Sequence, residues 1–175
     1  MPTPASNHTI GPEPGLLGIY LNDHLAGAAA TAQLGRRLAR RLEGAAAGEQ
    51  LSDLADDLAR DRTALTQFMG ELGVPVRRYK LYTAAAAELA GRLKFNGHLL
   101  TRSPLSTIVE LEMLRLGIEG QANGWRTLRT IGAEHGRPDP SRVDELIDRA
   151  VRQASLVEAL RVRAVERVFG IETAA

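Results

Sequence analysis

The most constraining feature of this 175-residue sequence is a three-four spacing of apolar residues that recurs in four long stretches. Such spacing places apolar side chains on one side of an α-helix, because the helix makes one turn about every 3.6 residues. The stretches cover residues 14–43, 49–72, 105–128 and 142–169, with rows of apolar residues from Leu17 to Leu42, Leu51 to Leu72, Leu111 to Leu128 and Leu146 to Ala164. Because one-sided helices need partners to pack on, the spacing predicts an all-α four-helix bundle.

The connections between these stretches predict how the helices follow one another. The turn around Gly44 and Gly48 is short, so the first two helices should be antiparallel neighbours. Residues 73–103 are too long for such a hairpin, and Tyr79–Phe95 within them have the composition of an extra short helix. We therefore expect one long crossover and a single domain over residues 14–170. Residues 1–13 are rich in proline and should form a flexible tail.

Composition excludes several classes of function. Twenty-two basic and 21 acidic residues give a net charge of +1, so the chain as a whole lacks the positive field expected of a protein that binds nucleic acid. There is no cysteine, which excludes disulfides and thiolate chemistry. Neither a long apolar run nor a signal peptide is found, so we expect a cytoplasmic protein that does not contact membranes. The phosphate-binding glycine loops, the serine nucleophile motif and the zinc-protease motif are also absent.

The strongest charge run lies near the end of the first stretch and contains Arg36, Arg37, Arg40 and Arg41. Counting outward from the turn places this run opposite three acidic residues of the second stretch, Asp53, Asp56 and Asp57. We interpret the two groups as a lattice of surface ion pairs, each of which contributes about 0–1 kcal/mol. The alternative is a patch for phosphate or nucleic acid, but the acidic neighbours would neutralise it and no aromatic residues are interleaved for stacking.

Polar residues interrupt each apolar row. His24 and Thr31 lie in the first row, Asp61 in the second, Gln121 in the third and Gln153 in the fourth. Four long helices with one crossover and inward-facing carboxylates resemble the ferritin-like four-helix bundle. This resemblance implies a di-iron or di-manganese site, built from a Glu on each of two helices and a Glu-x-x-His on each of the other two.

The residues at the corresponding positions depart from that ligand pattern. The Glu expected on the first helix is Thr31, and the Glu-x-x-His expected on the second becomes Asp57-Leu58-Ala59-Arg60 or Asp61-Arg62-Thr63-Ala64. The third helix offers two glutamates, Glu112 and Glu119. The fourth offers no histidine, only Gln153 and Glu158.

Two functional hypotheses follow. The first is a non-enzymatic ferritin-like bundle without a cofactor and of unassigned role, in which His24 is a core or interface histidine. Asp61 is then a buried acceptor for Thr31, which it should face, or for Arg62 or an arginine of another helix. The alternative is a carboxylate-bridged iron or manganese protein, oxidase-like, with four candidate metal ligands, His24, Asp61, Glu112 and Glu119.

A second apolar face on the third helix predicts self-association. Glu112 and Glu119 are seven residues apart and share one face with Leu105, Val109 and Leu116. This face differs from the row at Leu111 to Leu128, so the helix is apolar on two sides. We expect the second side to meet another copy of the chain in a homodimer. We also expect Gln121 and Gln153 to fix the helix register through hydrogen bonds.

Overall fold

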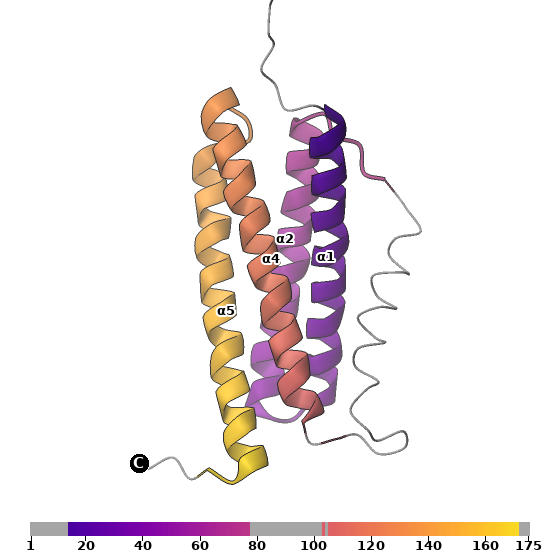
Figure 1. Ribbon diagram of the computed structural model, residues 1–175. Helices are drawn as coiled ribbons and strands as arrows, with labels where there is room; N and C mark the ends of the chain where they lie inside the picture. Colours follow the sequence, from indigo (N-terminus) through magenta and orange to yellow (C-terminus); the bar gives the residue numbers. More distant parts are fainter. Residues whose placement is uncertain (1–13, 78–102, 104, 172–175) are drawn as a thin grey trace, which may run out of the picture.

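The computed structural model describes residues 14–77, 103 and 105–171 (Figure 1). These residues form four long helices and no strand: α1 (Pro14–Arg41), α2 (Ala46–Glu71), α4 (Ser106–His135) and α5 (Pro140–Phe169). The all-α prediction is confirmed for the described part of the chain, and the four long predicted helices are present with ends shifted by up to seven residues. The predicted tail, residues 1–13, and the predicted extra helix, Tyr79–Phe95, lie outside the described residues.

Glycines and one aspartate set the helix ends. Gly44, in the turn between α1 and α2, has φ +82°, a conformation that glycine adopts without steric cost. Gly136 and Gly170 end α4 and α5 in the same left-handed conformation. Ser141 directly precedes the predicted start of this helix and has a side chain suited to an N-cap, but it lies inside α5. Asp139 is the N-cap, since its carboxylate accepts a hydrogen bond from Ser141 N at 3.0 Å and Pro140 occupies the first turn.

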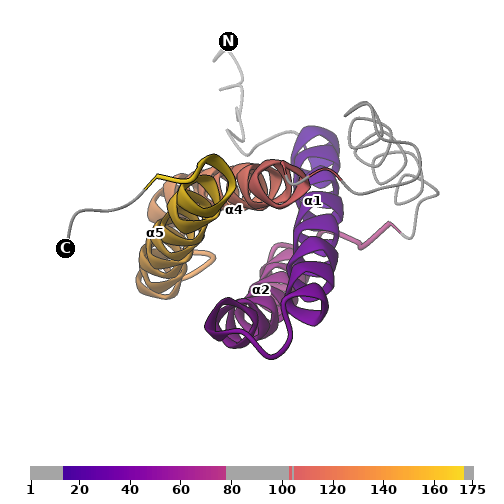
Figure 2. The ribbon, with the colours of Figure 1, turned by 90° about the horizontal axis from the view of Figure 1, so that it is seen from below.

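The helices are packed as two antiparallel hairpins, α1 with α2 and α4 with α5. In the end-on view of Figure 2, α4 lies between α5 and α1, and α2 lies beyond α1. The two hairpins make extensive internal contacts, α1 and α4 join them, and α2 and α5 touch at few positions. The α2–α5 side is therefore the least closely packed side of the molecule.

All neighbouring helices are antiparallel. Tyr20 near the start of α1 hydrogen-bonds to Thr127 near the end of α4, whereas Arg41 at the end of α1 pairs with Glu110 near the start of α4. The chain after α2 is held at the first of these ends, because Arg77 N donates to Asn22 Oδ1 at 2.7 Å. Residues 77 and 105 therefore lie at opposite ends of the helices.

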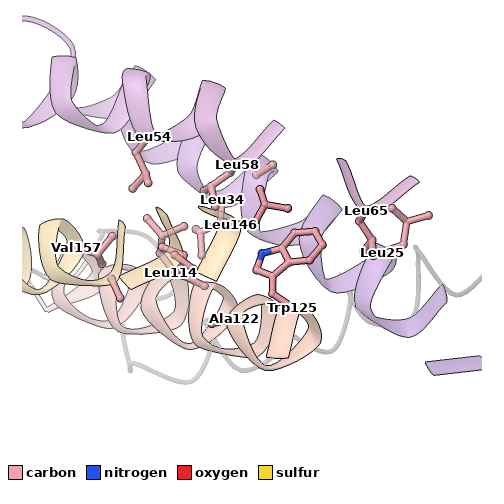
Figure 3. Packing of buried hydrophobic residues seen from close by; sticks show 14 of the residues in the cluster. Leu25, Leu34, Leu54, Leu58, Leu65, Leu114, Ala122, Trp125, Leu146 and Val157 are labelled. Carbon is pink, nitrogen blue, oxygen red and sulfur yellow. The ribbon is translucent and has the colours of Figure 1, made fainter. Parts of the chain in front are cut away.

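One hydrophobic core contains side chains from all four helices (Figure 3). Its largest member is Trp125, which is 1% exposed and meets the edge of Phe68 from α2 at a ring distance of 6.1 Å. Leu58 and Leu114 are fully buried in the same core. Burial of one such leucine contributes about 1.5–3 kcal/mol before entropic costs. The four predicted apolar rows are confirmed as the sides that face this core.

Every described helix carries too many polar and charged residues, for its length, to cross a lipid bilayer.

Candidate functional site

A buried carboxylate in the middle of α2 forms the best-defined polar cluster of the interior. Asp61 is 1% exposed and is held by two side chains of α5. Arg149 Nη1 donates to Asp61 Oδ1 at 2.8 Å, and Gln153 Nε2 donates to Asp61 Oδ2 at 2.8 Å. The guanidinium of Arg149 remains about one-third exposed. Asp61, Arg149 and Gln153 are called the aspartate triad below.

The triad corrects one sequence prediction and confirms another. Asp61 does not pair with Thr31, whose hydroxyl donates to the carbonyl of Gly27 in its own helix at 2.9 Å. Asp61 instead accepts a hydrogen bond from Arg149 of α5. This confirms the predicted alternative in which an arginine of another helix binds Asp61. Helix α5 supplies it because Asp61 lies on the side of α2 that faces α5 and not α1.

The pKa of Asp61 lies above its ordinary value. Burial is the largest cause, because desolvation penalises the charged carboxylate. The hydrogen bond from Gln153 and the charge of Arg149 act in the opposite direction, and the nearby carboxylate of Asp57 raises the pKa further. In the triad, the hydrogen bond from Gln153 and the charge of Arg149 therefore offset only part of the free-energy cost of burying the Asp61 carboxylate.

A cleft of about 310 Å³ lies beside the triad, between α2 and α5. It is called the α2–α5 cleft. The apolar parts of its wall are Leu54 and Leu156, and the polar parts come from six further side chains, Gln50, Asp53, Asp57, Arg149, Arg152 and Gln153. The wall of the cleft thus contains negative charges, positive charges and uncharged amides, together with two leucines.

Several buried amide and indole groups have no hydrogen-bond partner among the described residues. In the α2–α5 cleft these are the side-chain oxygens of Gln50 and Gln153. In the core they are both polar atoms of the Gln121 amide and the indole nitrogen of Trp125. The prediction that Gln121 fixes the helix register by hydrogen bonding is wrong, because neither polar atom of its amide has a hydrogen-bond partner among the described residues. Gln153 does bond across helices, to Asp61.

His24 lies at the contact between α1 and α4. Its ring packs on Tyr20 with ring centroids 4.3 Å apart, and a methyl group added to Gly124 would come within 3.0 Å of His24 Nδ1. Burial lowers the pKa of His24, and the charge of Asp23 opposes this shift in part. These contacts agree with the interpretation of His24 as a core or interface histidine, and the lowered pKa favours its neutral form.

The candidate metal ligands do not converge. Asp61 faces α5, and His24 faces α4. Glu112 is exposed on the outer side of α4, with Arg161 Nη1 at 3.9 Å from its carboxylate. Glu119 lines a separate groove between α4 and α5. Within the described residues, no group of three or more His, Asp and Glu side chains is placed to hold a metal ion. The described residues therefore do not fit a dinuclear metal site.

The buried glutamate of α4 is Glu110, which sequence reasoning did not select. It is 4% exposed and pairs with Arg41, and Arg37 Nη2 lies 3.8 Å from its other oxygen. The sequence spacing indicates that Glu110 is buried. It precedes Leu114 and Ile118 by four and eight residues and so lies on the same inward side of the helix.

These contacts also overturn the predicted ion-pair lattice between α1 and α2. Among the described residues no ion pair joins Arg36, Arg37, Arg40 or Arg41 to the aspartates of α2. Arg37 and Arg41 turn to α4, and Asp57 pairs with Arg60 in its own helix.

The second face of α4 is exposed over much of its length. Leu116 is 63% exposed and Leu105 is 41% exposed, and the side chain of Glu112 beside them is about half exposed. Next to Leu116 a groove of about 340 Å³ runs between α4 and α5, with small side chains such as Ala122 and Ala154 in its wall. We call this face, with Leu105, Glu112, Leu116 and Glu119, the α4 strip.

Comparison with family models, curated proteins and solved structures finds no match to this chain.

Proposed function

We propose that this chain is a non-enzymatic ferritin-like four-helix bundle that acts through binding and associates with a second copy of itself. The observation that carries the proposal is the aspartate triad. The carboxylate in the middle of the bundle pairs with the charge of Arg149 and accepts a hydrogen bond from Gln153, at the position where the ferritin-like resemblance implies a metal ligand. A guanidinium within hydrogen-bonding distance competes directly with a metal cation for the same oxygens.

The helix directions support the ferritin-like part of the proposal. Two antiparallel hairpins with an intervening connection between opposite ends of the bundle are the arrangement that one long crossover produces. An up-down-up-down bundle would instead connect neighbouring ends of α2 and α4 by a short loop.

The charges of the α4 strip support a second copy as its occupant. Arg115, which also pairs with Glu158 of α5, and Glu119 lie one turn apart beside Leu116, and both are partly exposed. If two α4 helices cross antiparallel on a twofold axis near Leu116, Arg115 of each copy comes next to Glu119 of the other. The strip is then self-complementary, as a twofold interface requires. Each Leu116 would lie beside the groove between α4 and α5 of the other copy.

Sedimentation equilibrium of the full chain tests the association. We expect a dimer at concentrations of about 10 µM, within the range of specific dimers. Leu116→Glu should give a monomer, because it places a charge at the centre of the strip. Leu16→Glu is the matched control, since Leu16 on α1 is 64% exposed, and it should remain dimeric. A monomeric wild type, or equal disruption by both variants, would refute the homodimer.

Elemental analysis, together with an Fe(II) oxidation assay, tests the non-enzymatic part of the proposal. We expect neither stoichiometric iron nor stoichiometric manganese in the purified protein, and no oxidation above the rate in buffer. Stoichiometric metal that is lost in Asp61→Asn would contradict the proposal and support the di-metal alternative with His24, Asp61, Glu112 and Glu119.

A further inference from the structure

Four of the six polar side chains of the α2–α5 cleft carry hydrogen-bond acceptors, namely the carboxylates of Asp53 and Asp57 and the amide oxygens of Gln50 and Gln153. The other two, Arg149 and Arg152, carry donors only. Both amide oxygens are buried and lack a donor among the described residues. Buried acceptors in proteins are nearly always satisfied, so two unsatisfied ones at the cleft indicate that a hydrogen-bond donor comes from outside the described residues.

Gln153 is the group that points most directly to a ligand. Its side chain is 4% exposed, and its nitrogen already donates to Asp61 at 2.8 Å. This hydrogen bond fixes which end of the amide faces Asp61, because a carboxylate oxygen can bind only the NH₂ end. The oxygen of Gln153 must then face away from Asp61 and remains available as an acceptor in the wall of the cleft.

The charges of the cleft select a ligand that is positive at one end. Arg149 is engaged by Asp61, and Asp57 pairs with Arg60 on the outside of α2. Asp53 and Arg152 are the two charged residues of the cleft without an ion-pair partner among the described residues, and they come from opposite walls. Two amide oxygens and a carboxylate suit an ammonium group, which has three donors and no acceptor.

We propose that the α2–α5 cleft binds a small aliphatic ammonium ion. The ammonium group donates to Gln153 Oε1, Gln50 Oε1 and the carboxylate of Asp53, while its alkyl chain packs between Leu54 and Leu156. The volume of about 310 Å³ matches about ten water molecules of about 30 Å³ each, or a ligand with a similar number of non-hydrogen atoms. A diamine and an amino acid with a basic side chain share this chemistry, and Arg152 would distinguish them by binding the amino acid's carboxylate.

Isothermal titration calorimetry of the full chain tests the proposal with putrescine and L-ornithine, which share one carbon skeleton and differ by a carboxylate. Sodium butyrate is the anionic control. We expect saturable binding of at least one of the two amines with a Kd of about 1 mM or below, and none of butyrate. Stronger binding of ornithine, lost in Arg152→Gln, assigns the site to amino acids. Stronger binding of putrescine, unchanged in Arg152→Gln, assigns it to diamines.

A pair of adjacent variants identifies the site. Asp53→Asn should weaken binding of the preferred amine about tenfold or more, because it removes the free carboxylate of the cleft. Asp56→Asn is the matched control, since Asp56 is an exposed carboxylate of the same helix that does not line the cleft, and its Kd should equal that of the wild type.

Two results would overturn the proposal. One is the absence of saturable binding of both amines up to about 10 mM, which would mean that the cleft holds water only. The other is equal weakening by Asp53→Asn and Asp56→Asn, which would mean non-specific attraction to the acidic face of α2. The residues of the cleft lie apart from the α4 strip, so ligand binding and dimerisation are tested independently.

Discussion

Replacement of Arg149 by methionine should destabilise the protein through Asp61. The variant keeps most of the apolar side-chain volume but leaves the 1% exposed carboxylate of Asp61 with Gln153 as its remaining partner. Removing one member of a buried ion pair costs about 3–5 kcal/mol. The guanidinium of Arg149 is about one-third exposed, and solvent screens its charge in part. We therefore expect a loss of about 2–3 kcal/mol in the free energy of unfolding at pH 7.

A double-mutant cycle isolates this effect. When Asp61 is first replaced by asparagine, Arg149→Met removes no counter-charge and should cost about 0.5 kcal/mol. The coupling energy between the two residues is then about 2 kcal/mol. Urea unfolding followed by the fluorescence of Trp125, the only tryptophan, measures all four proteins with one probe. For a protein of this size, Arg149→Met should also lower Tm by about 4–12 °C.

The same variants make a prediction about pH. Asp61 has a folded-state pKa above its ordinary value, and removal of Arg149 raises this pKa further. A carboxyl with a raised pKa binds its proton more tightly in the folded state than in the unfolded state. Its protonation therefore favours folding as the pH falls through the raised pKa towards about 4. The cost of Arg149→Met should be largest at pH 7 and should shrink as the pH is lowered.

Two results would refute this reasoning about the triad. One is the same cost for Arg149→Met in the wild type and in Asp61→Asn, which would show that the two side chains are not coupled. The other is a cost for Arg149→Met that grows as the pH falls from 7 towards 4, which would mean that Arg149 does not lower the pKa of Asp61.

Two matched pairs of substitutions test the packing of α4. Gly117→Ala should cost about 1–3 kcal/mol of stability in urea unfolding, because the added methyl group overlaps the side chain of Thr31 on α1. Gly27→Ala, which meets nothing within 4 Å, should stabilise α1 by up to about 1 kcal/mol, and a loss of stability there would contradict the packing. Glu110→Ala should lower Tm measurably, since Glu110 is buried against Arg41, whereas Glu112→Ala on the exposed strip should cost less than about 0.5 kcal/mol.

The helices could be predicted from the sequence because their evidence is local. A three-four spacing identifies the buried side of a helix without any knowledge of its neighbours. The rows from Leu51 to Leu72 and from Leu146 to Ala164 are buried as predicted apart from the partly exposed Leu72. The helix ends were less accurate, because Asp139 competes with Ser141 as the cap of α5 and a capping pattern alone does not rank them.

The partners of the polar residues could not be predicted in the same way. Periodicity shows that Asp61 is buried, but the choice between α1 and α5 as its neighbour depends on how the two hairpins pack together. Counting residues outward from the turn between α1 and α2 predicts that Asp61 faces Thr31, because the count takes only that hairpin into account. Glu110 and Glu112 illustrate a second limit. They are two residues apart, yet a rotation of about 200° along the helix buries one and exposes the other.

The ion pair between Asp61 and Arg149 also bears on how the chain is synthesised. The two residues are 88 positions apart, and the cation belongs to the last helix. The α1–α2 hairpin leaves the ribosome long before Arg149, so its inward carboxylate has to remain hydrated until α5 arrives. A nascent chain that stops after α4 would therefore expose an acidic, leucine-rich surface, and chaperones that hold such surfaces should bind it until translation is complete.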